Sequence, residues 1–471
     1  MTRSFFTRLC LLGLALIAAA VGCAGRTTGA SDFTQAANGS WTAKLSFVGS
    51  CDTSCSFFVR WRLVGTTTWT NGPRHTIPSK VTNASASETA SGLFPGAPYE
   101  YQACGRESSQ NEDFCAGPDG SGGSTQTFVP GPKRVYVANA TGSDISQYST
   151  SSTGLLSPLS PAAVDTIGTP AAMAVSPNGL SLYTVNGVPY AVNQYDIGSS
   201  GKLTAKNPAS VPHDGGAPGI FGVGITPDGR SLVASANGTF LDQFDIGAGG
   251  KLSSAVRAPG YPYINRPNGL AVSPNGKSVY VANTSGNNIL QYDVGTTGAL
   301  TAKNPLLVAS GGGSLPVDIA VRPDGKAVYV ANNSGNIAQF SVDTAGRLSA
   351  KSPALVTTPG PCLPSGIAVS PDGSSVYLSC TYNQNGTGTV VGQYDVAEDG
   401  RLTAKSPASV KLSGSPASDV AVSADGKSAY VTVTSLDALA QFSVGAGGRL
   451  SPKSPATVPT GDGPSGIAVT P

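Results

Sequence analysis

Six charged residues in the C-terminal part of the chain have side chains suited to acid–base chemistry or ligand binding. His213 is one of only two histidines in the sequence, and Asp214 follows it directly. An imidazole can transfer a proton near neutral pH, and a guanidinium can stabilise a developing negative charge. The candidate catalytic residues are His213, Asp214 and Arg266, and the candidate binding residues are Asp318, Arg322 and Asp419.

The same six residues have a second interpretation as solvated charges and turn residues, and their small number favours it. No serine lies in a Gly-x-Ser-x-Gly turn. Cys51 and Cys55 are spaced as in some zinc sites, but neither histidine lies at ligand spacing from them. Each Pro-Asp-Gly turn offers one carboxylate, whereas Ca²⁺ takes about six to eight oxygens. We therefore expect no metal and no cofactor.

These residues lie in a repeat that runs from Lys133 to the last residue. Its anchor is a short apolar pair, then Ser, Thr or Arg, then a Pro-Asp-Gly or Pro-Asn-Gly turn, with Ala424 in place of Pro in the sixth copy. A seventh copy begins at Ala468 and stops at Pro471. From Pro177 to Pro471 there are 294 residues over six intervals, a mean period of 49. The six complete anchors are 174–179, 224–229, 271–276, 320–325, 368–373 and 421–426.

Each repeat predicts four antiparallel strands, which is one propeller blade. Alternating apolar residues indicate the strands, and the turn needs Pro for a fixed φ and Gly for a positive one. The repeat region opens with a second strand at 133–139 and closes with a first strand at 466–471. These two strands would complete a seventh blade and leave no exposed edge. We therefore predict an all-β chain with a closed seven-bladed β-propeller over residues 133–471.

The repeat resembles the YVTN-type and lactonase-like seven-bladed propellers, which include 6-phosphogluconolactonase-like enzymes. The resemblance rests on runs such as Val279-Tyr-Val-Ala-Asn283 and Ser370-Pro-Asp-Gly373 and covers about 340 residues. It implies that the first strand of each blade lines a central channel. It also implies a hydrolase that opens a lactone ring with His, Arg and Glu at the channel mouth. His213 would then be the acid or base and Arg266 the clamp, although no longer His-containing lactonase motif is present.

The first segment is a predicted export signal, residues 1–23. Arg3 and Arg8 precede an apolar run from 9 to 21, which is the layout of a secretory signal and too short to span a bilayer comfortably. Ala20-Val-Gly-Cys23 resembles the bacterial lipobox, with Ala20 where that motif usually has Leu. Lipidation of Cys23 is the favoured interpretation, ordinary signal cleavage is the alternative, and an uncleaved anchor is the third.

Residues 32–130 predict a small antiparallel β-sandwich. The segment Gly92-Leu-Phe-Pro-Gly-Ala-Pro-Tyr-Glu-Tyr101 resembles the fibronectin type III signature, and Phe58–Leu63 followed by Trp69 resembles the central strand pair of that family. In an oxidising compartment, six cysteines outside the signal favour disulfides formed between near neighbours. They are Cys51, Cys55, Cys104, Cys115, Cys362 and Cys380.

Composition limits the partners. Charged residues make up 12% of the chain and the net charge is +2, which gives little attraction for a polyanion, so nucleic acid is not expected. The favoured function is binding or scaffolding at the cell envelope through the loop face of the propeller, and the alternative is a lactone hydrolase. The expected location is exported, anchored by lipid on the outer side of the membrane, or secreted. The expected partners are the membrane, through that anchor, and an envelope protein or a small-molecule ligand.

Overall fold

The computed structural model describes residues 23–35, 41–51, 55–63, 70–71, 74–77, 81–93, 99–107, 114–116, 126–128, 133–213, 222–235, 241–259, 263–311, 313, 315–360, 362–382, 389–414 and 416–471. The chain divides into two compact units, Met1–Phe94 with Pro98–Gly131, and Pro95–Ala97 with Pro132–Pro471. In the described ranges, no helix has the length and apolarity needed to cross a membrane. Of the predicted signal, all but Cys23 lies outside these ranges.

The first unit consists of two antiparallel sheets. One has the order β1 (Cys23–Gln35), β2 (Trp41–Cys51), β6 (Val81–Leu93). The other has β3 (Cys55–Leu63) and β7 (Tyr99–Glu107) at its centre, with β4 (Thr70–Asn71), β5 (His75–Ile77), β8 (Phe114–Ala116) and β9 (Gln126–Phe128) around them. The fibronectin resemblance, the lipid on Cys23 and the cysteine pairs of this unit stay predictions, because its side chains are not described.

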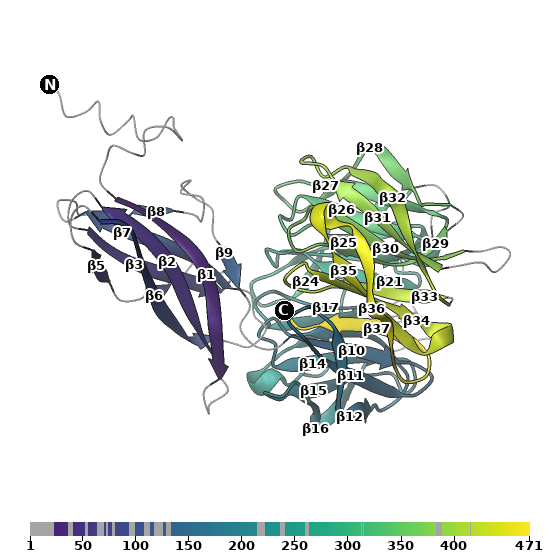
Figure 1. Cartoon of the computed structure of the whole chain (residues 1–471). Helices are drawn as coiled ribbons and strands as arrows, with labels where there is room; N and C mark the ends of the chain where they lie inside the picture. The colour runs from purple at the N-terminus through teal and green to yellow at the C-terminus, as the bar shows by residue number, and fades with distance from the viewer. Residues whose placement is uncertain are drawn as a thin grey trace. The chain divides into compact units, whose positions relative to one another are not determined.

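The second unit is a ring of seven four-stranded antiparallel sheets (Figure 1), as the repeat predicts. We number the blades from 1, the blade that holds both β37 and β10, to 7 along the chain. The inner strands of blades 1 to 7 are β37 (Pro464–Val469), β13 (Pro170–Val175), β17 (Gly222–Ile225), β21 (Pro267–Val272), β25 (Pro316–Val321), β29 (Cys362–Val369) and β33 (Ala417–Val422). The second strands are β10 (Arg134–Asn139), β14 (Ser181–Asn186), β18 (Ser231–Ser235), β22 (Ser278–Asn283), β26 (Ala327–Asn332), β30 (Ser375–Tyr382) and β34 (Ser428–Val433).

The two remaining strands of each blade lie further from the axis of the ring. The third strands are β11 (Asp144–Thr150), β15 (Ala191–Ile197), β19 (Leu241–Asp245), β23 (Asn288–Val294), β27 (Asn336–Val342), β31 (Thr389–Val396) and β35 (Ala438–Val444). The outer strands are β12 (Leu156–Asp165), β16 (Leu203–Pro212), β20 (Val256–Arg257), β24 (Leu300–Ala309), β28 (Leu348–Thr357), β32 (Leu402–Leu412) and β36 (Leu450–Pro459). Four single 3₁₀ turns occur in loops: η1 (Ala248–Gly250), η2 (Thr284–Gly286), η3 (Thr434–Leu436) and η4 (Ala446–Gly448).

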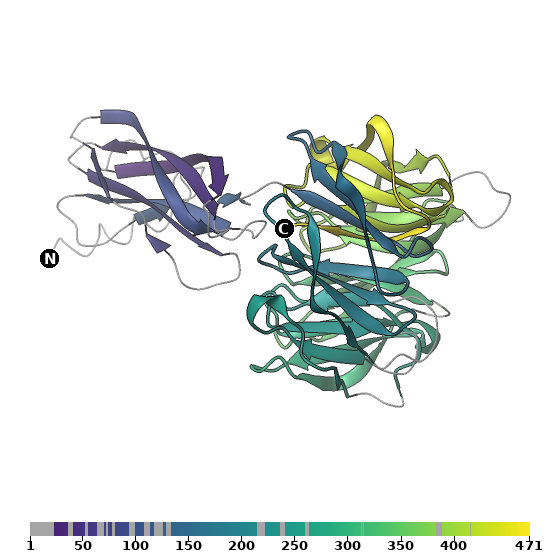
Figure 2. The same cartoon turned by 90° about the horizontal axis from the view of Figure 1, so that it is seen from below.

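The first and last strands of the repeat region close the ring in the way the sequence predicts. β37, the last strand of the chain, pairs antiparallel with β10, with Val135 opposite Val469 and Val137 opposite Ile467. In Figure 2 the yellow C-terminal strands lie beside blue strands from the start of the propeller. The closure leaves the ring without an unpaired first or last blade.

A buried glutamine in each third strand joins neighbouring blades. Its side-chain carbonyl accepts a hydrogen bond from a leucine N–H of the next blade, as Gln291 does from Leu348 at 3.1 Å. This leucine is the first residue of the outer strand, except that Gln194 accepts from Leu252, which lies just before β20. In six blades its amide also donates to a proline carbonyl of its own outer strand, as Gln291 does to Pro305 at 2.7 Å. The seven residues are Gln147, Gln194, Gln243, Gln291, Gln339, Gln393 and Gln441.

A tyrosine in the second strand makes a similar link in every blade except blade 3. Tyr280, for example, donates its hydroxyl to the Gly346 carbonyl of the next blade at 2.8 Å. Blade 3 has Val233 in this position, and there the Gln243 amide donates to the equivalent carbonyl, that of Gly298. The repeated Tyr and Gln of the sequence therefore pair backbone groups that the blade joints would otherwise bury unpaired.

Candidate functional site

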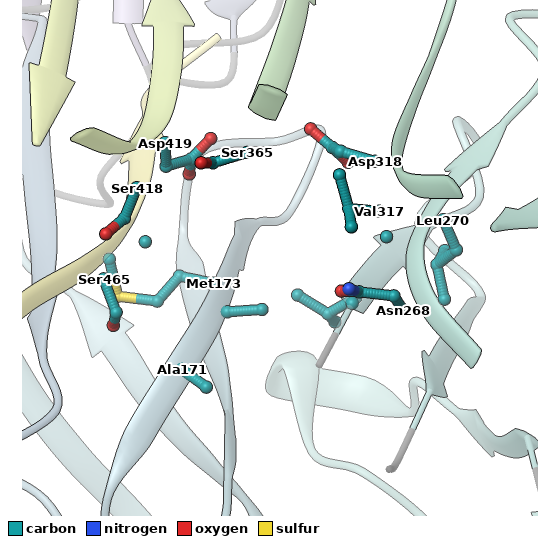
Figure 3. Close-up of a pocket in the computed structure, with 15 residues that line it drawn as sticks. Ala171, Met173, Asn268, Leu270, Val317, Asp318, Ser365, Ser418, Asp419 and Ser465 are labelled. Atoms are coloured by element: carbon teal, nitrogen blue, oxygen red, sulfur yellow. The ribbon is translucent and has the colours of Figure 1, made fainter. Parts of the chain in front are cut away.

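A cavity of about 170 Å³ opens in the centre of the ring, at the end where the inner strands begin (Figure 3). This volume would hold on the order of ten water molecules, or one small ring of the size of a sugar. Polar and small side chains make up most of its wall. The described lining residues are Ala171, Ala172, Met173, Gly222, Val223, Asn268, Gly269, Leu270, Val317, Asp318, Ser365, Ser418, Asp419, Ser465 and Gly466.

Of these fifteen residues, only Asp318 and Asp419 are ionisable. Both occupy the same position of their inner strands, two residues before the Ala-Val pair of the repeat. The other blades have Gly or Ala there, namely Gly466, Ala172, Gly222, Gly269 and Gly366. From blade 4 to blade 1 the position therefore reads Gly, Asp, Gly, Asp, Gly. This alternation places two carboxylates in one cavity, and the inner strand between them has glycine at the same position.

Each carboxylate is held by two backbone N–H groups from two different blades. Asp318 accepts from Ile319 in its own strand at 2.9 Å and from Ile367 in blade 6 at 2.8 Å. Asp419 accepts from Val420 at 2.7 Å and from Ile467 in blade 1 at 2.9 Å. Two oxygens with about four lone-pair sites can accept these bonds and still bind a ligand or water. Both carboxylates are thus fixed in position before any ligand arrives.

Glycine is required beside the carboxylates. A Cβ on Gly366 would lie 3.0 Å from both the Cα and an Oδ of Asp419. A Cβ on Gly269 would overlap the carboxylate of Asp318. The glycines of the alternating pattern therefore make room for the aspartates of the neighbouring blades.

Burial changes the acidity of both groups. Loss of solvation, together with the charge of Asp419, raises the pKa of Asp318 to about 7, although the two backbone N–H groups oppose this shift. Loss of solvation likewise raises the pKa of Asp419 to about 6. Between about pH 6 and pH 7, Asp318 is therefore mainly protonated while Asp419 is mainly ionised. This is the arrangement that acid–base chemistry needs.

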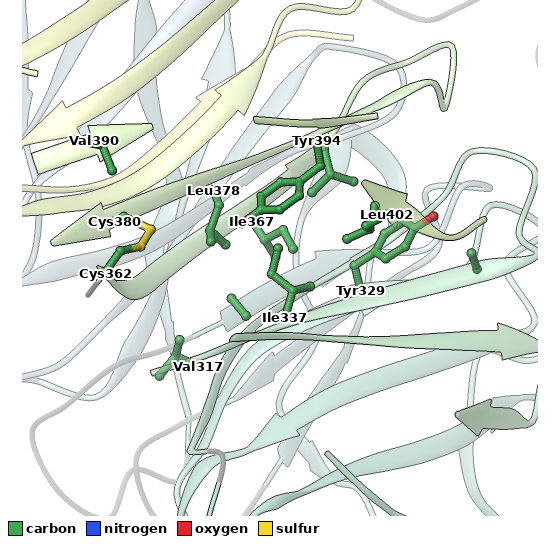
Figure 4. Close-up of a cluster of buried hydrophobic side chains, with 13 residues drawn as sticks. Val317, Tyr329, Ile337, Cys362, Ile367, Leu378, Cys380, Val390, Tyr394 and Leu402 are labelled. Atoms are coloured by element: carbon green, nitrogen blue, oxygen red, sulfur yellow. A yellow bond between two sulfur atoms is a disulfide. The ribbon is translucent and has the colours of Figure 1, made fainter. Parts of the chain in front are cut away.

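The strands that carry the site are fixed by the core of blades 5 and 6. Val317, adjacent to Asp318, packs in a buried cluster with Ile367, Leu378 and Tyr394 (Figure 4). The same cluster contains a disulfide between Cys362 and Cys380, whose Cα atoms are 5.3 Å apart. This bridge links the inner strand of blade 6 to its second strand, in line with the predicted pairing of near neighbours.

His213 lies outside the cavity lining. Its imidazole is buried between blades 2 and 3, with Nδ1 3.6 Å from the Asp242 carboxylate and its ring 6.0 Å from that of Tyr190. Asp214 lies outside the described residues. Arg266 is exposed just before β21, with a φ of 53°. The structure thus pairs His213 with Asp242, a residue that the sequence analysis does not single out, and brings neither His213 nor Arg266 into the wall of the cavity.

Arg322 also lies apart from Asp318 and Asp419. It follows the last residue of β25, four residues after Asp318, which at about 3.3 Å per residue is roughly 13 Å along the strand. Its guanidinium donates to the carbonyls of Gly373 and Glu398 and lies 3.2 Å from Asp324. The strand separates it from the two aspartates, so the three predicted binding residues do not form one site.

Comparison with known proteins gives the fold a family context. Residues 249–363 match the family described as Lactonase, 7-bladed beta-propeller. A candidate 6-phosphogluconolactonase from Bacteroides fragilis is 20% identical, with a TM-score of 0.61 over 72% of this chain and 98% of that one. The periplasmic gluconolactonase of Pseudomonas aeruginosa is 18% identical, with a TM-score of 0.60 over 72% of this chain and 99% of that one.

A protein from Lactobacillus plantarum, 17% identical, aligns over the same 72% of this chain and 99% of its own, with a TM-score of 0.57. The sequence matches none of the curated proteins. At these identities the solved structures establish the fold. The repeat region is therefore a seven-bladed β-propeller in which residues 249–363 resemble the lactonase family.

Proposed function

We propose that this protein is a lactone hydrolase whose reaction takes place in the central cavity of the propeller. The observation that carries the proposal is the pair of carboxyl groups in the cavity wall, Asp318 and Asp419, which are half-buried and whose pKa values are raised to about 7 and about 6. The match of residues 249–363 to a lactonase family supports it. Binding or scaffolding, the function favoured from the sequence, has less support because it does not require titrating groups inside the ring.

The two carboxyl groups divide the work according to their acidity. Ionised Asp419 takes a proton from a water molecule, and the water oxygen attacks the carbonyl carbon of the lactone. The bond between that carbon and the ring oxygen then breaks. Protonated Asp318 donates its proton to the ring oxygen, which leaves as an alcohol. The product is an open-chain hydroxy acid, and a proton passing from Asp419 to Asp318 restores the starting state.

One observation favours a structural role for the same pair. Each aspartate joins two blades through backbone N–H groups, so both contribute to the joints of the ring. A propeller that only binds a ligand would keep these bonds without any reaction in the cavity. Substitutions that leave the fold intact separate the two functions.

The test is hydrolysis of a panel of lactones by the full-length protein, followed by pH-stat titration. Asp419→Asn should lower kcat by about 10²–10⁴-fold, the usual contribution of one general base. Asp399→Asn is the matched control, since this aspartate and its partner Arg401 are both more than half exposed. Its activity should equal that of the unchanged protein.

Two outcomes would overturn the proposal. Hydrolysis no faster than the spontaneous rate would leave a binding propeller. Activity that survives Asp419→Asn and disappears in His213→Gln would place the reaction beside the His213–Asp242 pair instead. Circular dichroism of each variant checks that the fold is retained.

Export stays part of the proposal for the whole chain. Arg3, Arg8 and the apolar run support a signal, and Ala20-Val-Gly-Cys23 supports lipidation at Cys23. Mass spectrometry of the N-terminal peptide of the mature protein tests this. A diacylated Cys23 supports a lipid anchor, and an unmodified N-terminus near residue 23 supports secretion.

A further inference from the structure

We propose that the central cavity selects lactones without an anionic group, so that an uncharged sugar-type lactone is hydrolysed in preference to its phosphorylated counterpart. This inference rests on the proposed lactone hydrolysis and names the substrate class for the same site. Its basis is the distribution of charge in and around the cavity.

The cavity wall contributes only negative charge. The ionisable residues of the described lining are Asp318 and Asp419. Four backbone hydrogen bonds fix the two carboxylates, so they cannot swing away from an anionic substrate. A phosphate in the same small space would repel the ionised member of the pair and lie unpaired in a poorly solvated site.

The loops around the mouth of the cavity add almost no positive charge. Seven segments lead into the inner strands, and in the sequence Arg266 is their only Lys or Arg. Two further exposed cations, Arg257 and Lys411, lie at the ends of the outer strands β20 and β32, next to these segments. The described second strands end, and the third strands begin, at that same face, and in the sequence the segments that connect them contain no Lys, Arg or His. The loops leading into the inner strands are 166–169, 213–221, 258–266, 310–315, 358–361, 413–416 and 460–463, and the second set is 140–143, 187–190, 236–240, 284–287, 333–335, 383–388 and 434–437.

Positively charged loop residues gather at the opposite ends of the strands. The turns after the inner strands and those after the third strands carry them, and several are already paired, as Lys133 is with Asp425. These residues are Lys133, Lys202, Arg230, Lys251, Lys277, Arg322, Lys326, Arg347, Arg401, Lys427 and Arg449. Charges of one sign along a cleft repel ligands of the same sign and slow their approach. The same repulsion acts on the product, because hydrolysis creates a carboxylate.

The experiment compares kcat/KM of the full-length protein for glucono-δ-lactone and its 6-phosphate at pH 7.5. The expected ratio is at least tenfold in favour of the uncharged lactone, mainly through a lower KM. Added NaCl should reduce the ratio, because salt screens charge repulsion. The 6-O-acetyl lactone, uncharged and similar in length to the phosphate, controls for size and should be hydrolysed nearly as well as the parent.

Each other outcome counts against the inference in a distinct way. Equal or faster hydrolysis of the phosphorylated lactone overturns the charge selection while the proposed hydrolysis stands. If that activity is lost in Arg266→Gln, Arg266 provides an anion site at the rim. Poor hydrolysis of the acetyl lactone, with a ratio that salt does not change, shows that size decides the selection. Failure to hydrolyse any of the three lactones overturns both proposals.

Discussion

Loss of the proton from Asp318 should make the propeller less stable as the pH rises. In the folded protein the pKa of this carboxyl is about 7, against 3.8 for an unperturbed aspartate. Between these values the folded state binds one proton more than the unfolded state, so the free energy of unfolding falls with increasing pH. A difference of about three pKa units at 1.36 kcal/mol each gives a loss of ~4 kcal/mol between about pH 4 and pH 7.

Asp318→Asn isolates this contribution. Asparagine stays neutral, but its amide can accept only one of the two backbone N–H bonds from Ile319 and Ile367, which costs about 1–3 kcal/mol at every pH. The variant should therefore be less stable than the unchanged protein at pH 4 and should become comparable or more stable at pH 8. The difference between their free energies of unfolding should change by ~4 kcal/mol across that interval.

Urea unfolding from pH 4 to 8 measures the two curves. Trp41, Trp61 and Trp69 all lie in the first unit, so tryptophan fluorescence does not report on the propeller. Near-UV circular dichroism of tyrosine reports on the propeller, because nine tyrosines are fully buried in it. A constant difference between the curves would show that Asp318 ionises normally in the fold and would refute the reasoning. Asp419→Asn should show a smaller change, ~3 kcal/mol, because its pKa is raised only to about 6.

Three further predictions concern what holds the site in place. Gln291→Leu leaves the Leu348 N–H and the Pro305 carbonyl unpaired, and should lower the free energy of unfolding by about 2–5 kcal/mol in chemical denaturation; a loss as small as that of Tyr280→Phe, which removes one bond, would contradict the role of the glutamines. Reduction of Cys362–Cys380, which closes a loop of 18 residues, should cost about 3 kcal/mol, seen as a lower denaturation midpoint with dithiothreitol that is absent in the double alanine variant. Gly366→Ala should lower lactone hydrolysis by displacing Asp419, whereas Gly445→Ala, whose Cβ would meet only the Arg449 carbonyl at 3.6 Å, should leave activity unchanged; equal activity of the two would argue against close packing at Gly366.

Most of the fold could be predicted from the repeat, because its signals are local. Strand alternation and Pro-Asp-Gly turns depend on neighbouring residues, so each blade is recognisable on its own. The half repeats at 133–139 and 466–471 also predict closure, and β10 pairs with β37 as expected. The disulfide between Cys362 and Cys380 agrees with the predicted pairing of near neighbours, and in the structure one hairpin joins their strands.

The candidate site could be predicted only in part. Asp318 and Asp419 stand out in the sequence as charged residues of inner strands, and an alignment of the seven inner strands would have shown them at one position otherwise occupied by Gly or Ala. Arg322, only four residues from Asp318, appears equivalent in the sequence but lies beyond the end of the strand. His213 pairs with Asp242, which follows it by 29 residues and comes from another blade.

The sequence by itself determined the number of blades, their strands and the closure of the ring, because those depend on hydrogen bonds and turns within a repeat. Only the tertiary structure decided which charged residues meet. Burial at the axis raises the pKa values of Asp318 and Asp419, and each carboxylate binds backbone groups from two blades. Both effects arise from distances between repeats, which the order of residues within one repeat does not contain.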